Sequence, residues 1–285
     1  MRTRWRIPAG LVSAVVIATT AGCALPGTIQ GDALRGEVET SLPDDPAGQP
    51  VETLVRMGDF TLARGDALSA IGMYRQAHQT APSAITPLLR LGASLAQVGS
   101  YQESAGAYRT ALEIDAVNAE AQRGLGNALV ALNRPSEALP YLETALAISN
   151  DYRAYNSIGV ALDHLGRHED AQFYYRQGVA AAPNDIDLTS NLAISLALSG
   201  QFQEAIQFAE RAATVPEAGV RHRQTLGLVL ALAGRTDAAA DVMAADMPVE
   251  DAINAVQYFE VVRSIPSSAD RAVAIGGAGS PAIGP

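Results

Sequence analysis

The amino-acid sequence predicts an all-α protein, a solenoid of helical hairpins, on three observations. Residues that suit the end of a helix return every 33 or 34 positions, which is the spacing of stacked helical repeats. Each is followed five residues later by a small residue and preceded seven residues earlier by glycine or alanine, so paired helices can pack closely. Aromatic residues make up only 5% of the chain, which suits repeats without a large central core. The turn residues are Gly65, Gly99, Asn133, Gly166, Gly200 and Gly234.

Residues 152–185 illustrate how each hairpin is predicted. Apolar residues at helical spacing lead up to Leu165, and Gly166 then ends the first helix because glycine enters the left-handed region at little cost. A second apolar stripe follows, and Pro183 ends it. Helices this short are marginal alone. The sequence therefore predicts that each hairpin is stabilised by its neighbours.

The same pattern divides most of the chain into repeats. Six hairpins are predicted, over residues 51–84, 85–118, 119–151, 152–185, 186–219 and 220–248. Residues 249–265 are predicted to form one further helix, because the last hairpin of a solenoid leaves an apolar face that a capping helix can cover. Residues 266–285 are rich in glycine, serine, proline and alanine, and we expect them to be disordered.

The N-terminal segment has the layout of a secretory signal. Three arginines precede an apolar run that is too short to span a membrane comfortably, over residues 1–22. The following Thr20-Ala21-Gly22-Cys23 resembles a bacterial lipobox, which implies that Cys23 is lipidated and becomes the mature N-terminus. Residues 23–50 are predicted to be a flexible tether. Ala24, and not aspartate, follows the cysteine, and resemblance to the lipoprotein sorting signals of enterobacteria then implies the periplasmic side of the outer membrane over the inner membrane.

The repeat pattern resembles the tetratricopeptide repeat (TPR). The large residue of that repeat's second helix is matched by Tyr74, Tyr108, Leu142 and Tyr175, and its closing proline by Pro82 and Pro183. The resemblance implies a TPR-type α-solenoid, a right-handed superhelix of helix–turn–helix repeats with a C-terminal capping helix. It also implies that protein partners bind the concave face, which the first helix of each hairpin lines.

Composition and residue spacing argue against several other function classes. The net charge is −10 and the chain contains no lysine, so nucleic acid is not an expected partner. His164 and His168 lie four apart, but Gly166 separates them at a turn, so we expect two partly exposed histidines rather than a metal site. No catalytic group, metal, cofactor or small-molecule substrate is predicted, and the chain is expected not to be an enzyme.

Polar residues on the middle first helices are the candidate partner-binding groove. An arginine and an asparagine side by side can hold a peptide carboxylate or backbone through charge-assisted and amide hydrogen bonds. Arg123 with Asn127 resembles one arm of the carboxylate clamp known in the TPR family. The alternative is a solvated helix face with internal ion pairs. The groove residues are Arg123, Asn127, Arg153, Asn156, Asp163, Ser190 and Gln224.

A lipobox, a tether, about six repeats and a terminal helix together resemble the TPR lipoproteins of Flp (Tad) pilus assembly, the TadD family. That resemblance implies a scaffold with a pilotin-like or assembly role, whose partners are a secretin or other pilus or secretion subunits. One alternative is an adaptor for cell-wall enzymes or for outer-membrane protein assembly. A more remote alternative is an envelope hydrolase.

Overall fold

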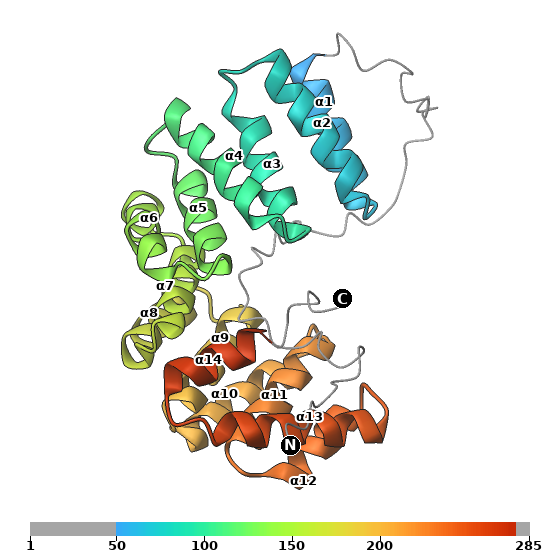
Figure 1. Ribbon diagram of the computed structural model, residues 1–285, viewed down its shortest axis with the longest axis vertical. Coiled ribbons are helices and arrows are strands. Elements are labelled where there is room, and N and C mark those ends of the chain that lie inside the picture. Colours follow the sequence, from blue (N-terminus) through green and yellow to red (C-terminus); the bar gives the residue numbers. More distant parts are fainter. Residues whose placement is uncertain (1–49, 278–285) are drawn as a thin grey trace, which may run out of the picture. The chain divides into compact units, whose positions relative to one another are not determined.

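The computed structural model describes residues 50–277, and within them the chain forms fourteen helices (Figure 1). Each of the six predicted hairpin ranges contains two of these helices, from α1 and α2 to α11 and α12. The predicted all-α, TPR-type solenoid with a helix after the last hairpin is confirmed. The helices are α1 (Val51–Ala63), α2 (Ala67–Thr80), α3 (Ile85–Gln97), α4 (Tyr101–Ile114), α5 (Ala119–Ala131), α6 (Pro135–Ser149), α7 (Tyr152–His164), α8 (His168–Ala181), α9 (Ile186–Leu198), α10 (Phe202–Thr214), α11 (Val220–Leu232), α12 (Thr236–Ala244), α13 (Val249–Arg263) and α14 (Ser268–Gly277).

The predicted turn residues all adopt the left-handed conformation. Their φ angles lie between 58° at Asn133 and 86° at Gly65. Glycine and asparagine tolerate this region, so each first helix ends just before its turn residue and the chain reverses direction. Asn133 and Gly166 lie 33 and not 34 positions apart, and the chain between them turns sharply after α6. There Asn150 also adopts a positive φ of 48°, and its N–H donates to Leu146 O.

In five of the six hairpins the helices approach closely because glycine faces a large side chain, and in the fifth Ala193 takes the place of the glycine. A Cβ on Gly58 would lie 2.5 Å from the ring of Tyr74, and one on Gly92 would lie 2.8 Å from the ring of Tyr108. The small residue that follows each turn is also buried, as at Ala70 and Ser104. The two small-residue positions of the repeat pattern therefore set the distance between paired helices.

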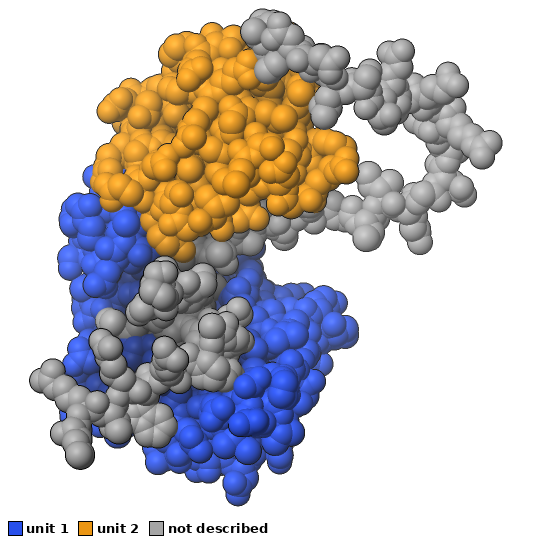
Figure 2. Space-filling model, turned by 45° about the vertical axis from the view of Figure 1, so that its right-hand side comes forward, with its two compact units in different colours: residues 1–19, 125–285 blue, residues 20–124 orange. Residues whose placement is uncertain are grey.

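The chain divides into two compact units, which Figure 2 colours separately. Among the described residues, one unit runs from 50 to 124 and the other from 125 to 277, so the boundary falls inside α5. In the first unit, α2, α3 and α4 meet in a core of buried side chains. These are Ala70, Ile71, Tyr74, Leu91, Leu95 and Ala107.

In the second unit α9 is the most deeply buried helix. Every residue from Leu188 to Leu198 is buried, including Thr189, Asn191 and Ser195. It packs between α8 and α10, and it also contacts the neighbouring first helices α7 and α11. A helix that is apolar on most of its surface requires such an enclosed position.

The predicted disordered tail over residues 266–285 is wrong where the structure describes it, because α14 forms there. Ala272 and Ile275 of α14 are fully buried, and Arg271 donates to Leu198 O at the end of α9. A low-complexity composition did not prevent a helix, since contacts with distant helices supply the stabilisation that the segment lacks by itself. Residues 278–285, like Cys23 and the rest of residues 1–49, lie outside the described residues.

Candidate functional site

In the second unit, polar side chains link the first helices of consecutive hairpins. Asn191 Nδ2 on α9 donates to Asn156 Oδ1 on α7 across 2.9 Å. Arg221 Nη2 on α11 donates to Asp187 Oδ1 on α9 across 2.8 Å. We call these two contacts the polar rungs. Each joins residues 34 or 35 positions apart, so the repeat period itself brings the partners together.

The second polar rung carries opposite charges and an oriented histidine. His222 Nδ1 accepts from the Gly219 N–H at 3.1 Å, so its Nε2 carries the proton and lies 3.2 Å from Asp187 Oδ1. The hydrogen bond from His222 and the charge of Arg221 hold the pKa of Asp187 below its usual value. The side chains of Asp187 and Arg221 are 39% and 34% exposed, so this pair is accessible to a partner.

Four of the predicted groove residues reach the surface of their own helices. Arg123 and Asn127 are partly exposed on α5, and Asn156 is partly exposed on α7. Arg153 is also partly exposed, and its guanidinium lies 5.2 Å from the ring centroid of Tyr152 and bonds to Asp151. These side chains combine amide groups with cations, which suits recognition of carboxylates and peptide backbone.

The other three predicted groove residues are buried, so their assignment to an open groove is wrong. Asp163 is 1% exposed, Ser190 is 2% exposed and Gln224 is 9% exposed. Ser190 and Gln224 occupy the same helix position as Asn156, but α9 is more enclosed than α7, and the buried residues of α11 begin at Gln224 itself. The position of each residue within its repeat was predicted correctly. Its burial was not, because burial depends on contacts between hairpins that the repeat position does not specify.

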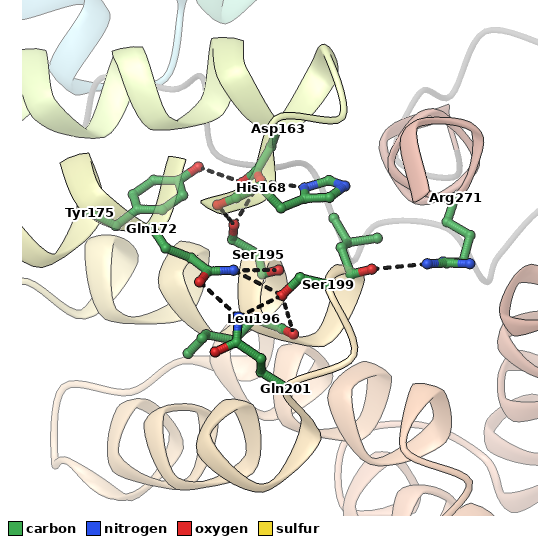
Figure 3. A network of polar contacts seen from close by, with 10 residues as sticks. Asp163, His168, Gln172, Tyr175, Ser195, Leu196, Ser199, Gln201 and Arg271 are labelled. Carbon is green, nitrogen blue, oxygen red and sulfur yellow. Dashed lines mark hydrogen bonds and ion pairs between the residues drawn. The ribbon is translucent and has the colours of Figure 1, made fainter. Parts of the chain in front are cut away.

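Asp163 instead anchors a buried network that joins two hairpins (Figure 3). Its Oδ1 accepts from Ser195 Oγ at 2.7 Å and lies 2.7 Å from His168 Nδ1, while its Oδ2 accepts from Tyr175 at 3.0 Å. Burial raises the pKa of the Asp163 carboxyl, although three hydrogen bonds oppose that shift. Burial and the neighbouring carboxylate raise the pKa of Tyr175 well above its ordinary value.

The network continues through side-chain amides to the next hairpin turn. Gln172 Nε2 on α8 donates to Ser199 Oγ, and Gln201 Nε2 donates to Gln172 Oε1, both across 2.9 Å. Figure 3 shows these groups converging where α8 meets the end of α9. The expectation that His168 is partly exposed is wrong, because this network buries it to 2% exposure. The network fixes the fourth hairpin against the fifth.

Serine, histidine and aspartate meet in this network, but not as a nucleophile and base. Ser195 Oγ donates to the carboxylate and not to the imidazole, so the histidine is not placed to take the hydroxyl proton as it does in a catalytic triad. Ser195 is fully buried, which also excludes a substrate from it in this conformation. Within residues 50–277, no group of three or more histidine, cysteine, aspartate or glutamate side chains is placed to hold a metal ion.

The second helices carry their own periodic contacts between hairpins. Arg75 pairs with Glu103 in one unit, and Arg176 Nη2 lies 2.8 Å from Glu204 Oε1 in the other. Exposed ion pairs contribute little stability, so these two pairs mainly keep the surface of the second helices charged and hydrated.

In the second unit, α6, α7 and α8 also line a shallow hollow of about 250 Å³ that includes Glu143, Ile158 and the exposed Phe173.

The polar rungs contain residues that sequence reasoning missed, namely Asn191, Asp187 and Arg221. One signal could have found them: aligning the first helices on the turn residues places each beside its partner in the preceding or following hairpin. The buried network had a weaker signal, since polar residues interrupt the otherwise apolar stretch of α9. No helix within the described part of the chain is both long and apolar enough to cross a bilayer.

Comparison with known proteins identifies the repeat. Residues 83–151 match one tetratricopeptide repeat family model, and residues 123–186 and 159–220 match another. An uncharacterized protein of Sinorhizobium fredii (strain NBRC 101917 / NGR234), y4yS, is 42% identical over 88 residues, which are 30% of this chain and 48% of that protein. The match thus spans about half the length of this curated relative.

Solved structures share the fold over a larger part of the chain. PilW, described as a widely conserved type IV pilus biogenesis factor, has a TM-score of 0.65 and 20% identity, covering 73% of this chain and 98% of its own. PilF of Pseudomonas aeruginosa has a TM-score of 0.59 and 19% identity, covering 73% and 96%. The TPR protein TTC0263 of Thermus thermophilus has a TM-score of 0.57 and 19% identity, covering 63% and 98%. At these identities the likeness establishes the fold.

Proposed function

Because this chain carries tetratricopeptide repeats, a class that binds protein partners and is generally non-catalytic, we propose that it is a lipid-anchored scaffold. It stands on the periplasmic side of the outer membrane and holds protein subunits during assembly of an envelope machine. The observation that carries this proposal is the row of accessible polar groups on the first helices, from Asn156 to the Asp187–Arg221 rung. Such groups recognise carboxylates, amides and peptide backbone.

The anchor is proposed from the sequence around Cys23. Thr20-Ala21-Gly22-Cys23 follows a basic and apolar leader, and Cys23 is the single cysteine of the chain. Each buried acyl CH₂ contributes about 0.8 kcal/mol, so two or more chains on one cysteine give lasting attachment. With the residues up to 50 as a tether, the repeats would reach partners at some distance from the membrane surface.

The machine is proposed to be a pilus of the Flp (Tad) type. The lipobox, the tether and the six repeats resemble the TPR lipoproteins of that system, and PilW, which shares the fold, is described as a type IV pilus biogenesis factor. The proposed partners are a secretin or another pilus assembly subunit. The bound elements would be peptide segments with a free carboxylate or exposed backbone amides, since the accessible groups are the guanidinium of Arg221 and the amide of Asn156.

The anchor is tested by Cys23→Ala in the native host. We expect loss of labelling by radioactive palmitate and release of the protein from the outer membrane into the periplasm. A matched control is Ser41→Ala, which changes a residue of similar size in the same tether and should keep both label and attachment. Continued membrane attachment of the Cys23→Ala protein without label contradicts the anchor.

The scaffold role is tested by crosslinking and affinity capture from membranes. Recovery of a secretin or of pilus subunits supports the pilus assignment, while recovery of cell-wall enzymes instead contradicts it. Arg123→Glu is expected to reduce capture at unchanged helicity, because the partly exposed guanidinium of Arg123 is one of the proposed contacts. Undiminished capture by the Arg123→Glu protein removes α5 from the binding surface.

A further inference from the structure

The last helix leaves the regular order of the array. In every complete hairpin of the second unit, the second helix packs along its own first helix, as α8 does on α7 and α10 on α9. After α13, the helix α14 makes only limited contact with α13 and also contacts α7 and α9, which lie several hairpins back in the sequence. Figure 1 shows α14 beside α9. It contacts these first helices, which form the side that carries the polar rungs.

An arginine holds α14 at the end of α9. Arg271 Nη2 donates to Leu198 O across 2.9 Å, the contact drawn from Arg271 in Figure 3. Arg271 Nη1 donates to Ile265 O across 2.7 Å. Leu198 is the last residue of α9, and its carbonyl is one of the groups that a helix leaves without an internal partner. A cation at this position is also favoured by the negative end of the helix dipole.

Small and apolar side chains complete the seat. Ala269 lies against the turn after α7, where a Cβ on Gly166 would approach the Cβ of Ala269 to 2.9 Å. Ala272 and Ile275 of α14 are fully buried. We call the surface made by the C-terminal ends of α7 and α9 with Gly166 the helix seat. Its shape accepts a helix whose contacting side carries small residues, one larger apolar residue and one arginine.

The occupant of the helix seat is weakly held. α14 has ten residues and ends in two glycines, so it is too short to be stable without its contacts. It packs against α13 over a limited contact, which includes a hydrogen bond from the Tyr258 hydroxyl to Ala274 O at 2.9 Å. A segment with few buried side chains opens at low free-energy cost. The seat can therefore be vacated without unfolding the hairpins.

We propose that the helix seat is a docking site for a short partner helix, and that α14 occupies it until such a helix replaces it. The proposal rests on the proposed function only in that the partner is a protein. The chemistry of the partner helix follows from α14 itself: an arginine for Leu198 O, and alanine and isoleucine for the apolar floor. α14 itself carries Asp270 beside Arg271, so the seat requires the arginine side chain and not a net positive charge on the helix.

The test uses the full chain and a labelled synthetic peptide of residues 264–277 as the probe, with binding measured by fluorescence anisotropy. Arg271→Glu should release α14, because a carboxylate would face Leu198 O and the negative end of α9. Only molecules with a vacant seat can bind the probe, so the apparent dissociation constant is the intrinsic one divided by the vacant fraction. Because the variant leaves most seats vacant, it should bind the probe at least about tenfold more tightly than wild type. Arg235→Glu, the same charge change at the turn between α11 and α12, should bind like wild type.

A second variant, Ala272→Asp, repeats the test without touching the arginine, and circular dichroism confirms that each variant keeps its helices. Equal probe affinity for wild type and both release variants means that α14 does not hold the site and overturns the proposal. Absence of binding to either folded release variant overturns it as well, as does equal binding of a probe with glutamate in place of arginine. The measurement needs neither lipid nor a pilus, so the proposal can stand if the scaffold's location or machine is different.

Discussion

The ring of Tyr175 on α8 lies directly against the backbone of Gly159 on α7, so closely that a Cβ at Gly159 would come within 2.5 Å of Tyr175 Cε1. Tyr175 then extends past this contact and donates its hydroxyl to Asp163 on the same α7. The Tyr175 side chain thus packs in the contact between the two helices and also hydrogen-bonds to the buried network. The helix separation and the network are consequently coupled.

Replacing Gly159 by alanine should destabilise the protein by about 1–3 kcal/mol, because the new methyl group would overlap the ring of Tyr175, which is fully buried and held by its hydrogen bond to Asp163. Chemical denaturation monitored by circular dichroism measures the change. Gly72→Ala is the matched control, since a Cβ at Gly72 in α2 meets nothing within 4 Å. Alanine is the better helix former, so this control should be neutral or stabilising by up to about 1 kcal/mol. Equal effects at the two sites would contradict the packing argument.

Asp163→Ala should lower the free energy of unfolding by about 3 kcal/mol or more. The substitution leaves the buried donors of Ser195, His168 and Tyr175 without their acceptor, and each such group costs about 1–3 kcal/mol. The control is Asp170→Ala on the same hairpin, whose exposed ion pair with Arg167 should contribute less than about 1 kcal/mol. If Asp163 instead lined an open groove, its removal would reduce partner capture and leave the unfolding midpoint unchanged.

The polar rung of Asp187 should make stability depend on pH in acid. In the folded state the pKa of Asp187 lies below the ordinary value of 3.8, because His222 donates to it and Arg221 is near. The unfolded chain therefore binds this proton first as pH falls, so the contribution is present above about 3.8 and is lost through the lower folded pKa. Asp187→Asn should show a smaller loss of unfolding midpoint between pH 7 and pH 3 than wild type.

Asn191→Ala is the control for that experiment, because it breaks the neighbouring polar rung without removing a charge. It should lower the unfolding midpoint by a similar amount at both pH values. An Asp187→Asn protein with the same acid sensitivity as wild type would show that the rung does not contribute through its charge.

The sequence alone determined the hairpins and their order. Glycine or asparagine at a left-handed turn, as at Gly65 and Asn133, is a local requirement of backbone geometry, and the constant period repeats it. The contact between Gly58 and the ring of Tyr74 also follows from local spacing, because both residues lie within one hairpin. For this reason fold class and turn positions could be predicted before any contact between hairpins was known.

Only the tertiary structure decided which polar residues are open to a partner. Asp163 and Asn156 lie on the same helix, yet one is buried by Ser195 from the next hairpin and the other stays partly exposed. The position of α14 was likewise unpredictable, because Arg271 bonds to Leu198 O, a backbone atom 73 residues away. A repeat period specifies neighbours in the array, whereas burial and the return of a terminal helix depend on contacts between segments that the period does not relate.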